Sequence, residues 1–243
     1  MKTIILRTVA GIFDFFMSFS VSLSFCIYAY KKQIKFFKPF CFGALVYLIK
    51  FIVFNIFLIG CSEFKMFTKE FGEYPIYYYF YVFLYHFLVA LYILVSRIFI
   101  FSFFMKKDKD IFGKGASFAV GFCSLYNFVN CTIVCIFQFG SFLDMRARYI
   151  ILDAFDNVFV IFADVGYTLV VLYILNKKTK IKYFLFPILL IIDTLTCFFS
   201  EIIILYVRNF LIGKVFSIMV SLVYLVIALI LRKHFKNKLV SNI

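Results

Sequence analysis

The stretch from Pro75 to Lys107 constrains the fold of this chain most, because it holds roughly thirty residues with almost no charge. Roughly 20 apolar residues in a helix cross a hydrocarbon core of about 30 Å, so this run is long enough to span a membrane. Tyrosines crowd its first turns and Lys106 and Lys107 close its end, as side chains at the two membrane interfaces do. Arg97 lies inside it, about two turns before the lysines, where an arginine either snorkels to the interface or pairs with a neighbouring helix.

The composition of the whole chain extends this prediction. Of the 243 residues, 65% are hydrophobic and 16% are charged, which is too little polar surface to cover a soluble globule of this size. Further apolar runs accompany the first, and no connection between them exceeds about 14 residues. We therefore expect an all-α polytopic membrane protein in which residues 1–243 form a single domain of seven transmembrane helices. The expected helices cover 9–30, 39–61, 75–105, 115–138, 149–175, 183–206 and 209–231.

The connections between the expected helices differ in their content of Lys and Arg. Four basic residues lie in each of the segments 31–38, 106–114, 177–182 and 232–238. Two basic residues lie in each of the segments 1–8, 62–75, 139–148 and 207–214. The two sets alternate along the chain, and the positive-inside rule assigns the richer set to the cytoplasm. We therefore expect the N-terminus outside the cell and the C-terminus in the cytoplasm.

Several function classes are excluded by the sequence. The excess of 26 Lys and Arg over 12 Asp and Glu lies in short clusters between apolar runs, so we expect no nucleic-acid partner. The chain has no phosphate loop, nucleophile elbow or dinucleotide fingerprint, and its two histidines, His86 and His234, are too few for the usual metal clusters. We expect no enzyme, metal or cofactor. A retinal protein needs a lysine near the middle of the last helix, whereas Lys214 lies at the outer end, as an interfacial lysine does.

The layout around Arg97 carries a family resemblance. Arg97 occupies, toward the cytoplasmic end of the third expected helix, the place of the arginine in the Asp-Arg-Tyr motif of rhodopsin-like receptors, although no Asp or Asn precedes it. The stretch FFKPFCFGALVYLI entering the second helix, the short loops and the long aromatic third helix resemble nematode serpentine chemoreceptors over residues 1–150. This resemblance implies a G-protein-coupled receptor that transduces a small-molecule or peptide ligand to a heterotrimeric G protein, with Arg97 at the cytoplasmic coupling surface.

Charged residues inside the expected helices are the next signal, because an ionisable group at bilayer depth costs on the order of 3 kcal/mol or more unless it is paired or hydrated. Lys50, Asp164 and Asp193 lie at comparable depth in three different helices. We expect them to form one intramembrane charge cluster in which Lys50 pairs with Asp164 or Asp193. In the fourth helix, Asn127 and Asn130 are expected to form hydrogen bonds between helices.

The fifth expected helix carries an acidic stripe. Asp153, Asn157 and Asp164 lie within about 40° of one another on a helical wheel, and Asp156 lies on an adjoining face. Asp153 and Asp156 are expected near the outer surface, where hydration costs little, and Asp164 near the middle of the membrane.

Two interpretations of function follow. In the receptor interpretation, the ligand lies among the outer halves of the third, fifth and sixth helices and contacts Tyr85, His86, Asp164 and Asp193. In the alternative, the protein is a small polytopic transporter or channel subunit whose path uses Lys50, Asp164 and Asp193. Without a ligand the same charges form a polar clamp between helices, and a lone histidine such as His86 is more often a helix-packing group. Both interpretations predict a multi-pass protein of the plasma membrane that has membrane lipids as partners.

Overall fold

A computed structural model describes residues 2–32, 36–62, 75–104, 111–139, 147–176, 180–206 and 210–240, and within them the chain is all-helical. The helices are α1 (Lys2–Lys32), α2 (Phe37–Ser62), α4 (Pro75–Phe104), α5 (Ile111–Phe139), α6 (Ala147–Leu175), α7 (Lys182–Tyr206) and α8 (Phe210–Val240). Each expected run corresponds to one of them. The largest differences are at α1, which begins at Lys2, and at α8, which continues past 231, because Lys and Arg are good helix formers and hydropathy marks the membrane boundary, not the helix end.

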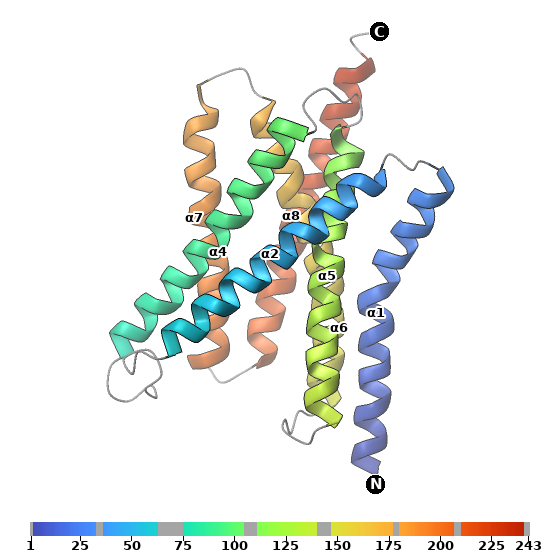
Figure 1. The fold of residues 1–243 in the computed structure, drawn as a ribbon, viewed down its shortest axis with the longest axis vertical. Coiled ribbons are helices and arrows are strands. Elements are labelled where there is room, and N and C mark those ends of the chain that lie inside the picture. The colour runs from blue at the N-terminus through green and yellow to red at the C-terminus, as the bar shows by residue number, and fades with distance from the viewer. Residues whose placement is uncertain are drawn as a thin grey trace.

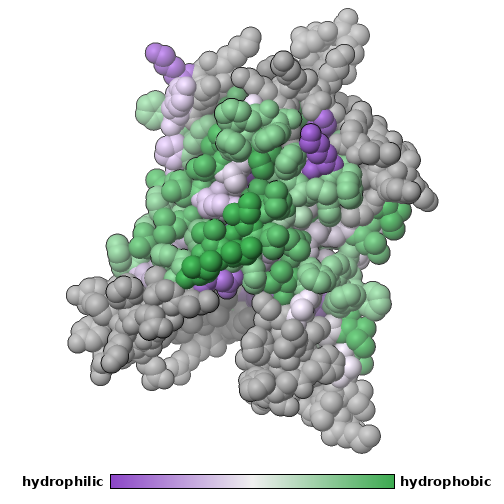
Figure 2. All heavy atoms as spheres, in the orientation of Figure 1, coloured by the Kyte–Doolittle hydropathy of each residue, from purple (hydrophilic) through white to green (hydrophobic). Residues whose placement is uncertain are grey.

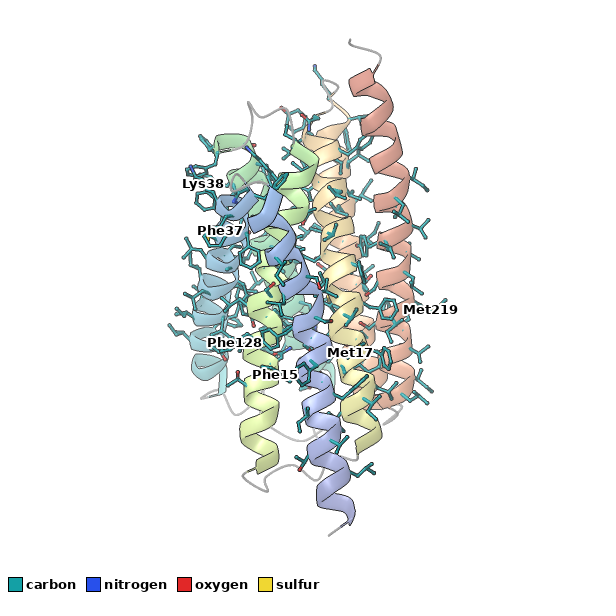
Figure 3. All side chains as sticks on the ribbon, turned by 90° about the vertical axis from the view of Figure 1, so that its right-hand side faces the viewer. Phe15, Met17, Phe37, Lys38, Phe128 and Met219 are labelled. Carbon is teal, nitrogen blue, oxygen red and sulfur yellow. The ribbon has the colours of Figure 1, made fainter. Side chains whose placement is uncertain are left out.

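The surface of the described part is apolar. Four segments are long and apolar enough to cross a membrane: Phe37–Phe57, Tyr78–Phe104, Ile150–Leu175 and Tyr183–Ile203. Two shorter apolar stretches lie in α1 and α8: Thr8–Ser24 and Leu211–Ile227. Hydrophobic side chains cover most of the described part of the face that Figure 2 shows. Met219, 59% exposed, projects outward from α8 in Figure 3. Apolar side chains outside and buried polar side chains inside indicate a membrane protein.

The helices stand side by side in one bundle and alternate in direction along the chain (Figure 1). The two termini lie at opposite ends of this bundle. The helix ends that flank the four lysine- and arginine-rich connections all lie at the end that carries the C-terminus, and the ends that flank the poorer connections lie at the other. The bundle therefore has the up-and-down order that the charge pattern requires.

Helix α6 lies at the centre of the bundle, in contact with α1, α4, α5, α7 and α8. Its Ile161 and Leu169 belong to one buried cluster with residues of α2, α4 and α5, such as Phe118. Its Tyr167 and Val171 belong to a second buried cluster with residues of α4, α7 and α8. Because opposite faces of α6 are buried in different clusters, this helix fixes the arrangement of the others.

Glycines allow two helix pairs to approach closely. A Cβ atom on Gly43 of α2 would overlap the carbonyl oxygen of Phe118 in α5, and one on Gly121 of α5 would overlap the carbonyl oxygen of Phe40 in α2. Gly166 of α6 has the same relation to the backbone of α8. Small residues at a membrane-helix interface let two backbones touch and gain packing energy, which accounts for the tight pairs α2–α5 and α6–α8.

A buried polar cluster joins α1, α5 and α6. The Asn157 side-chain amide donates to Asp14 Oδ1 at 3.3 Å and to Ser18 Oγ at 3.2 Å. The Asn127 amide donates to the backbone oxygens of Ser18 and Asn157, both at 3.3 Å. All of these residues are buried. The predicted hydrogen bonding of Asn127 between helices is confirmed, whereas Asn130 makes no such bond with a described residue.

Candidate functional site

A cavity of about 480 Å³ lies between α2, α4, α5, α6, α7 and α8. The residues that the sequence predicted as ligand contacts, charge cluster or coupling residue all line it: Lys50, Tyr85, His86, Arg97, Asp164 and Asp193. The structure thus brings together, from four helices, side chains that are far apart in the sequence. The remaining walls are mainly apolar and aromatic, as in most small-molecule sites.

The cavity begins near the middle of the bundle and continues into the half that lies away from the C-terminus. Its lining residues run from Tyr85 to Arg97 on α4, from Asp193 to Glu201 on α7 and from Ser217 to Tyr224 on α8. The first part of α4, the last part of α7 and the first part of α8 lie at the end opposite the C-terminus (Figure 1). The cavity therefore extends from mid-bundle toward the end that the charge pattern predicts to face outside.

Arg97 lies at the deep end of this cavity and is 1% exposed. Its Nη2 forms an ion pair with Asp164 Oδ1, and its Nε donates to Thr168 Oγ1 at 3.0 Å. The guanidinium carbon lies 5.3 Å from the ring centroid of Phe122 and 4.9 Å from that of Tyr167. Arg97 is thus held by α5 and α6 and does not snorkel to an interface. A paired, planar cation stacked on aromatic rings suits such a site.

Among the described residues, Lys50 forms the expected ion pair with neither Asp164 nor Asp193. Its Nζ lies 5.7 Å from the ring centroid of Tyr47 and 5.9 Å from that of Phe122, so Phe122 contacts both cations of the cavity. Lys50 has no ion pair with a described residue, and neither does Asp193. The expectation fails because Asp164 is bound by Arg97, whose fork of donors also reaches Thr168.

Two further ion pairs lie toward the predicted outer end. His86 Nε2 and Glu201 Oε2 are 2.5 Å apart, with side chains 15% and 38% exposed. Lys214 Nζ lies 2.5 Å from Asp156 Oδ2, and Ser217 donates to the other oxygen of Asp156 at 2.9 Å. Lys214 was expected as an interfacial lysine, but it is largely buried because it neutralises Asp156 across the α6–α8 interface.

Four buried polar atoms of the cavity residues have no hydrogen-bond partner in the described part of the chain. They are Arg97 Nη1, Asp164 Oδ2, Tyr167 Oη and Tyr224 Oη. Buried polar groups in native proteins are nearly always satisfied by protein, water or ligand. One such atom lies on each residue of the Arg97–Asp164 pair, and two phenols of the lining, Tyr167 and Tyr224, carry the others, so a polar molecule or water would satisfy all four.

The sequence did not identify Glu201, Tyr167 or Tyr224 as site residues. Tyr167 carried a usable signal, because it follows Asp164 by three positions and so lies on the same helix face. Glu201 and Tyr224 had no such signal, because no polar residue near them on the same helix indicated a site. The acidic stripe of α6 is divided between neighbours: Asn157 faces α1, Asp156 binds α8 and Asp164 binds α4, while the side chain of Asp153 lies outside the described part.

No protein-family model, curated protein or solved structure matches this chain. Among the described residues, no group of three His, Cys, Asp or Glu side chains is placed to hold a metal ion. The side chains that line the described cavity include charged groups, phenols and aromatic rings.

Proposed function

We propose that the chain is a seven-transmembrane receptor of the chemosensory type, which binds an extracellular ligand in the cavity and signals to a heterotrimeric G protein. In this proposal all seven helices cross the plasma membrane, with the N-terminus outside. The observation that carries it is the Arg97–Asp164 pair, which joins α4 to α6 at the deep end of the cavity and leaves one polar atom on each side free.

A ligand in this cavity can change how α4 and α6 are held together, because Arg97 and Asp164 both line it. Any group that binds Arg97 Nη1 or Asp164 Oδ2 changes the strength of the bond between α4 and α6. A ligand shifts a conformational equilibrium by as much as it prefers one state over the other. Arg97 then holds the inactive arrangement, and the basic connections at the other end of the bundle form the surface that meets the G protein.

The test needs no known ligand. Asp164→Asn keeps the shape of the side chain but removes the charge that holds Arg97, so we expect a rise in basal guanine-nucleotide exchange of about fivefold or more. The measurement is GTP-analogue binding in membranes from cells that express the chain together with heterotrimeric G proteins, at matched surface expression.

The control is Asp156→Asn, the same substitution in the same helix. It breaks the ion pair with Lys214, which joins α6 to α8, and Asp156 does not line the cavity. Basal exchange should stay at the level of the unsubstituted chain. An unchanged basal rate in Asp164→Asn, or an equal rise in both variants, would remove the support for a receptor.

A transporter is the second candidate, because Lys50, Arg97, Asp164 and Asp193 line one cavity from four helices. Ionisable residues that face one another inside a helical bundle often mark ion or substrate paths. Purified protein in liposomes with an internal pH-sensitive dye tests this under an imposed membrane potential. Proton flux that disappears in Asp193→Asn would favour the transporter over the receptor.

A further inference from the structure

The free atoms of the Arg97–Asp164 pair define what a ligand must offer. The two residues bind each other through Nη2 and Oδ1, so Arg97 Nη1 and Asp164 Oδ2 remain as a donor and an acceptor without a partner on two residues that line the cavity. A carboxylate satisfies the guanidinium donor and an ammonium satisfies the carboxylate acceptor. An α-amino acid carries both groups on one carbon, so it can satisfy both atoms of the pair from a single position.

The charges around the cavity favour the same class of molecule. Lys50 and Arg97 supply two positive charges and Asp164 and Asp193 two negative ones, and they come from four different helices. Of these, Lys50 and Asp193 have no ion pair with a described residue. A ligand with a net charge would leave one charge uncompensated in a poorly hydrated site, which is costly at bilayer depth. A zwitterion keeps the balance and gives each charge a partner.

Glu201 does not disturb this balance at the deep end. It lies with His86 toward the predicted outer end of the cavity, and its side chain is 38% exposed. Water therefore reaches this carboxylate, and its charge is screened from the buried groups.

The walls of the cavity indicate the side chain of the ligand. Rings of Tyr85, Phe122, Tyr126, Tyr167 and Tyr224 line it, and those of Tyr167 and Tyr224 lie edge to face at 6.0 Å. Aromatic walls pack best against another aromatic ring, and they also attract an ammonium group. The volume of about 480 Å³ falls within the range of about 300–1,000 Å³ that small-molecule sites occupy. The cavity accommodates a zwitterion that carries a ring.

We propose that the cavity binds an aromatic α-amino acid as a zwitterion, with its carboxylate on Arg97 and Lys50, its ammonium on Asp164 and Asp193, and its ring among the tyrosines. This inference rests on the proposed function only in taking the cavity as the ligand site. Whether binding leads to G-protein activation is tested separately by the basal exchange of Asp164→Asn.

A headgroup series on the unsubstituted, full-length protein tests the ligand class. L-phenylalanine, 3-phenylpropionate and phenethylamine share one ring and chain, and they differ in carrying both charges, only the carboxylate or only the ammonium. Calorimetry on protein in lipid nanodiscs measures the three affinities. We expect L-phenylalanine to bind about tenfold or more tightly than either analogue, because each analogue leaves one buried charge without its partner. Equal binding of either analogue, or no binding of any of the three, overturns the ligand class.

A variant pair tests the position of the ammonium. Asp193→Asn should weaken L-phenylalanine about tenfold or more and leave 3-phenylpropionate unchanged or tighter. The control is Thr194→Val on the same turn of α7, because the Thr194 hydroxyl bonds to the Leu190 carbonyl at 2.8 Å and does not line the cavity. Unchanged affinity for L-phenylalanine in Asp193→Asn overturns the assignment, and the headgroup series decides the ligand class if this variant does not fold.

Discussion

Replacing Arg97 by methionine measures what the ion pair between α4 and α6 contributes to stability. Methionine has a long, unbranched side chain without charge, so Arg97→Met keeps much of the volume and leaves the Asp164 carboxylate alone. Removing one partner of a buried pair costs about 3–5 kcal/mol. Arg97 is 1% exposed and the side chain of Asp164 is 13% exposed, and Asp164 Oδ2 is buried, so the remaining carboxylate is largely shielded from water. We therefore expect a loss of about 3–5 kcal/mol of unfolding free energy.

The double variant separates the pair from the packing. Asp164→Leu alone leaves the Arg97 cation unpaired, whereas the double variant, Arg97→Met with Asp164→Leu, leaves neither charge. The double variant should therefore lose less stability than the sum of the two single variants. We expect this difference, the coupling energy, to be about 2 kcal/mol or more. Unfolding of the purified protein in mixed micelles with increasing denaturing detergent gives the four free energies. Lys50→Met combined with Asp164→Leu is the control and should show a smaller coupling. Additivity between Arg97 and Asp164, or a larger coupling to Lys50, would refute the assigned pair.

Three shorter predictions follow. Gly43→Val should abolish most of the folded yield, because the new side chain would overlap the backbone of α5. The control Leu45→Val, on the exposed side of α2, should be tolerated. Fluorescence size-exclusion chromatography measures the folded yield of both variants. Asn157→Leu should cost about 1–3 kcal/mol in the same micelle titration, because Asp14 and Ser18 lose its donors, and an unchanged midpoint would contradict this. A C-terminal epitope tag should be undetectable on intact cells, and labelling without permeabilisation would reverse the orientation.

The helices were predictable because a membrane leaves the chain few choices. Backbone groups in hydrocarbon have no water to bond, so an apolar run of sufficient length is a helix. Pro75 begins α4 as its place before the apolar run indicated, and α7 ends at Tyr206 as expected. The extension of α8 to Val240 was not predictable from hydropathy, because the helix continues in a polar, basic sequence.

The partner of Asp164 was not predictable from depth alone. Counting residues placed Arg97 near the cytoplasmic interface and Lys50 near the centre, and so favoured Lys50. A side chain in a helix points back toward the N-terminus, however, and the long arm of Arg97 carries its guanidinium toward the middle of α4. There it meets Asp164 and Thr168 of α6. Which faces of two helices meet depends on how each helix is rotated and how the two cross in the bundle. These quantities could not be predicted from this one sequence.

The same reason explains the division of the acidic stripe. Asn157 and Asp164 do lie on one side of α6, as the helical wheel predicted. Because α1 and α4 contact α6 at different heights, Asn157 meets Asp14 and Ser18 whereas Asp164 meets Arg97. A helical wheel shows direction around an axis, but it does not show which neighbour occupies that direction at each level.

The central place of α6 has a consequence for how a cell makes this protein. Translation proceeds from the N-terminus, so the ribosome delivers α1, α2, α4 and α5 to the membrane before the helix that most of them pack against. The hydrogen bonds that Asn157 gives to Asp14 and Ser18 form only after the fifth helix has entered the bilayer. Until then α1 has a polar face that its final neighbour has not yet covered. In the seven-span topology that we propose, we therefore expect the first helices to stay beside the insertion machinery until α6 arrives.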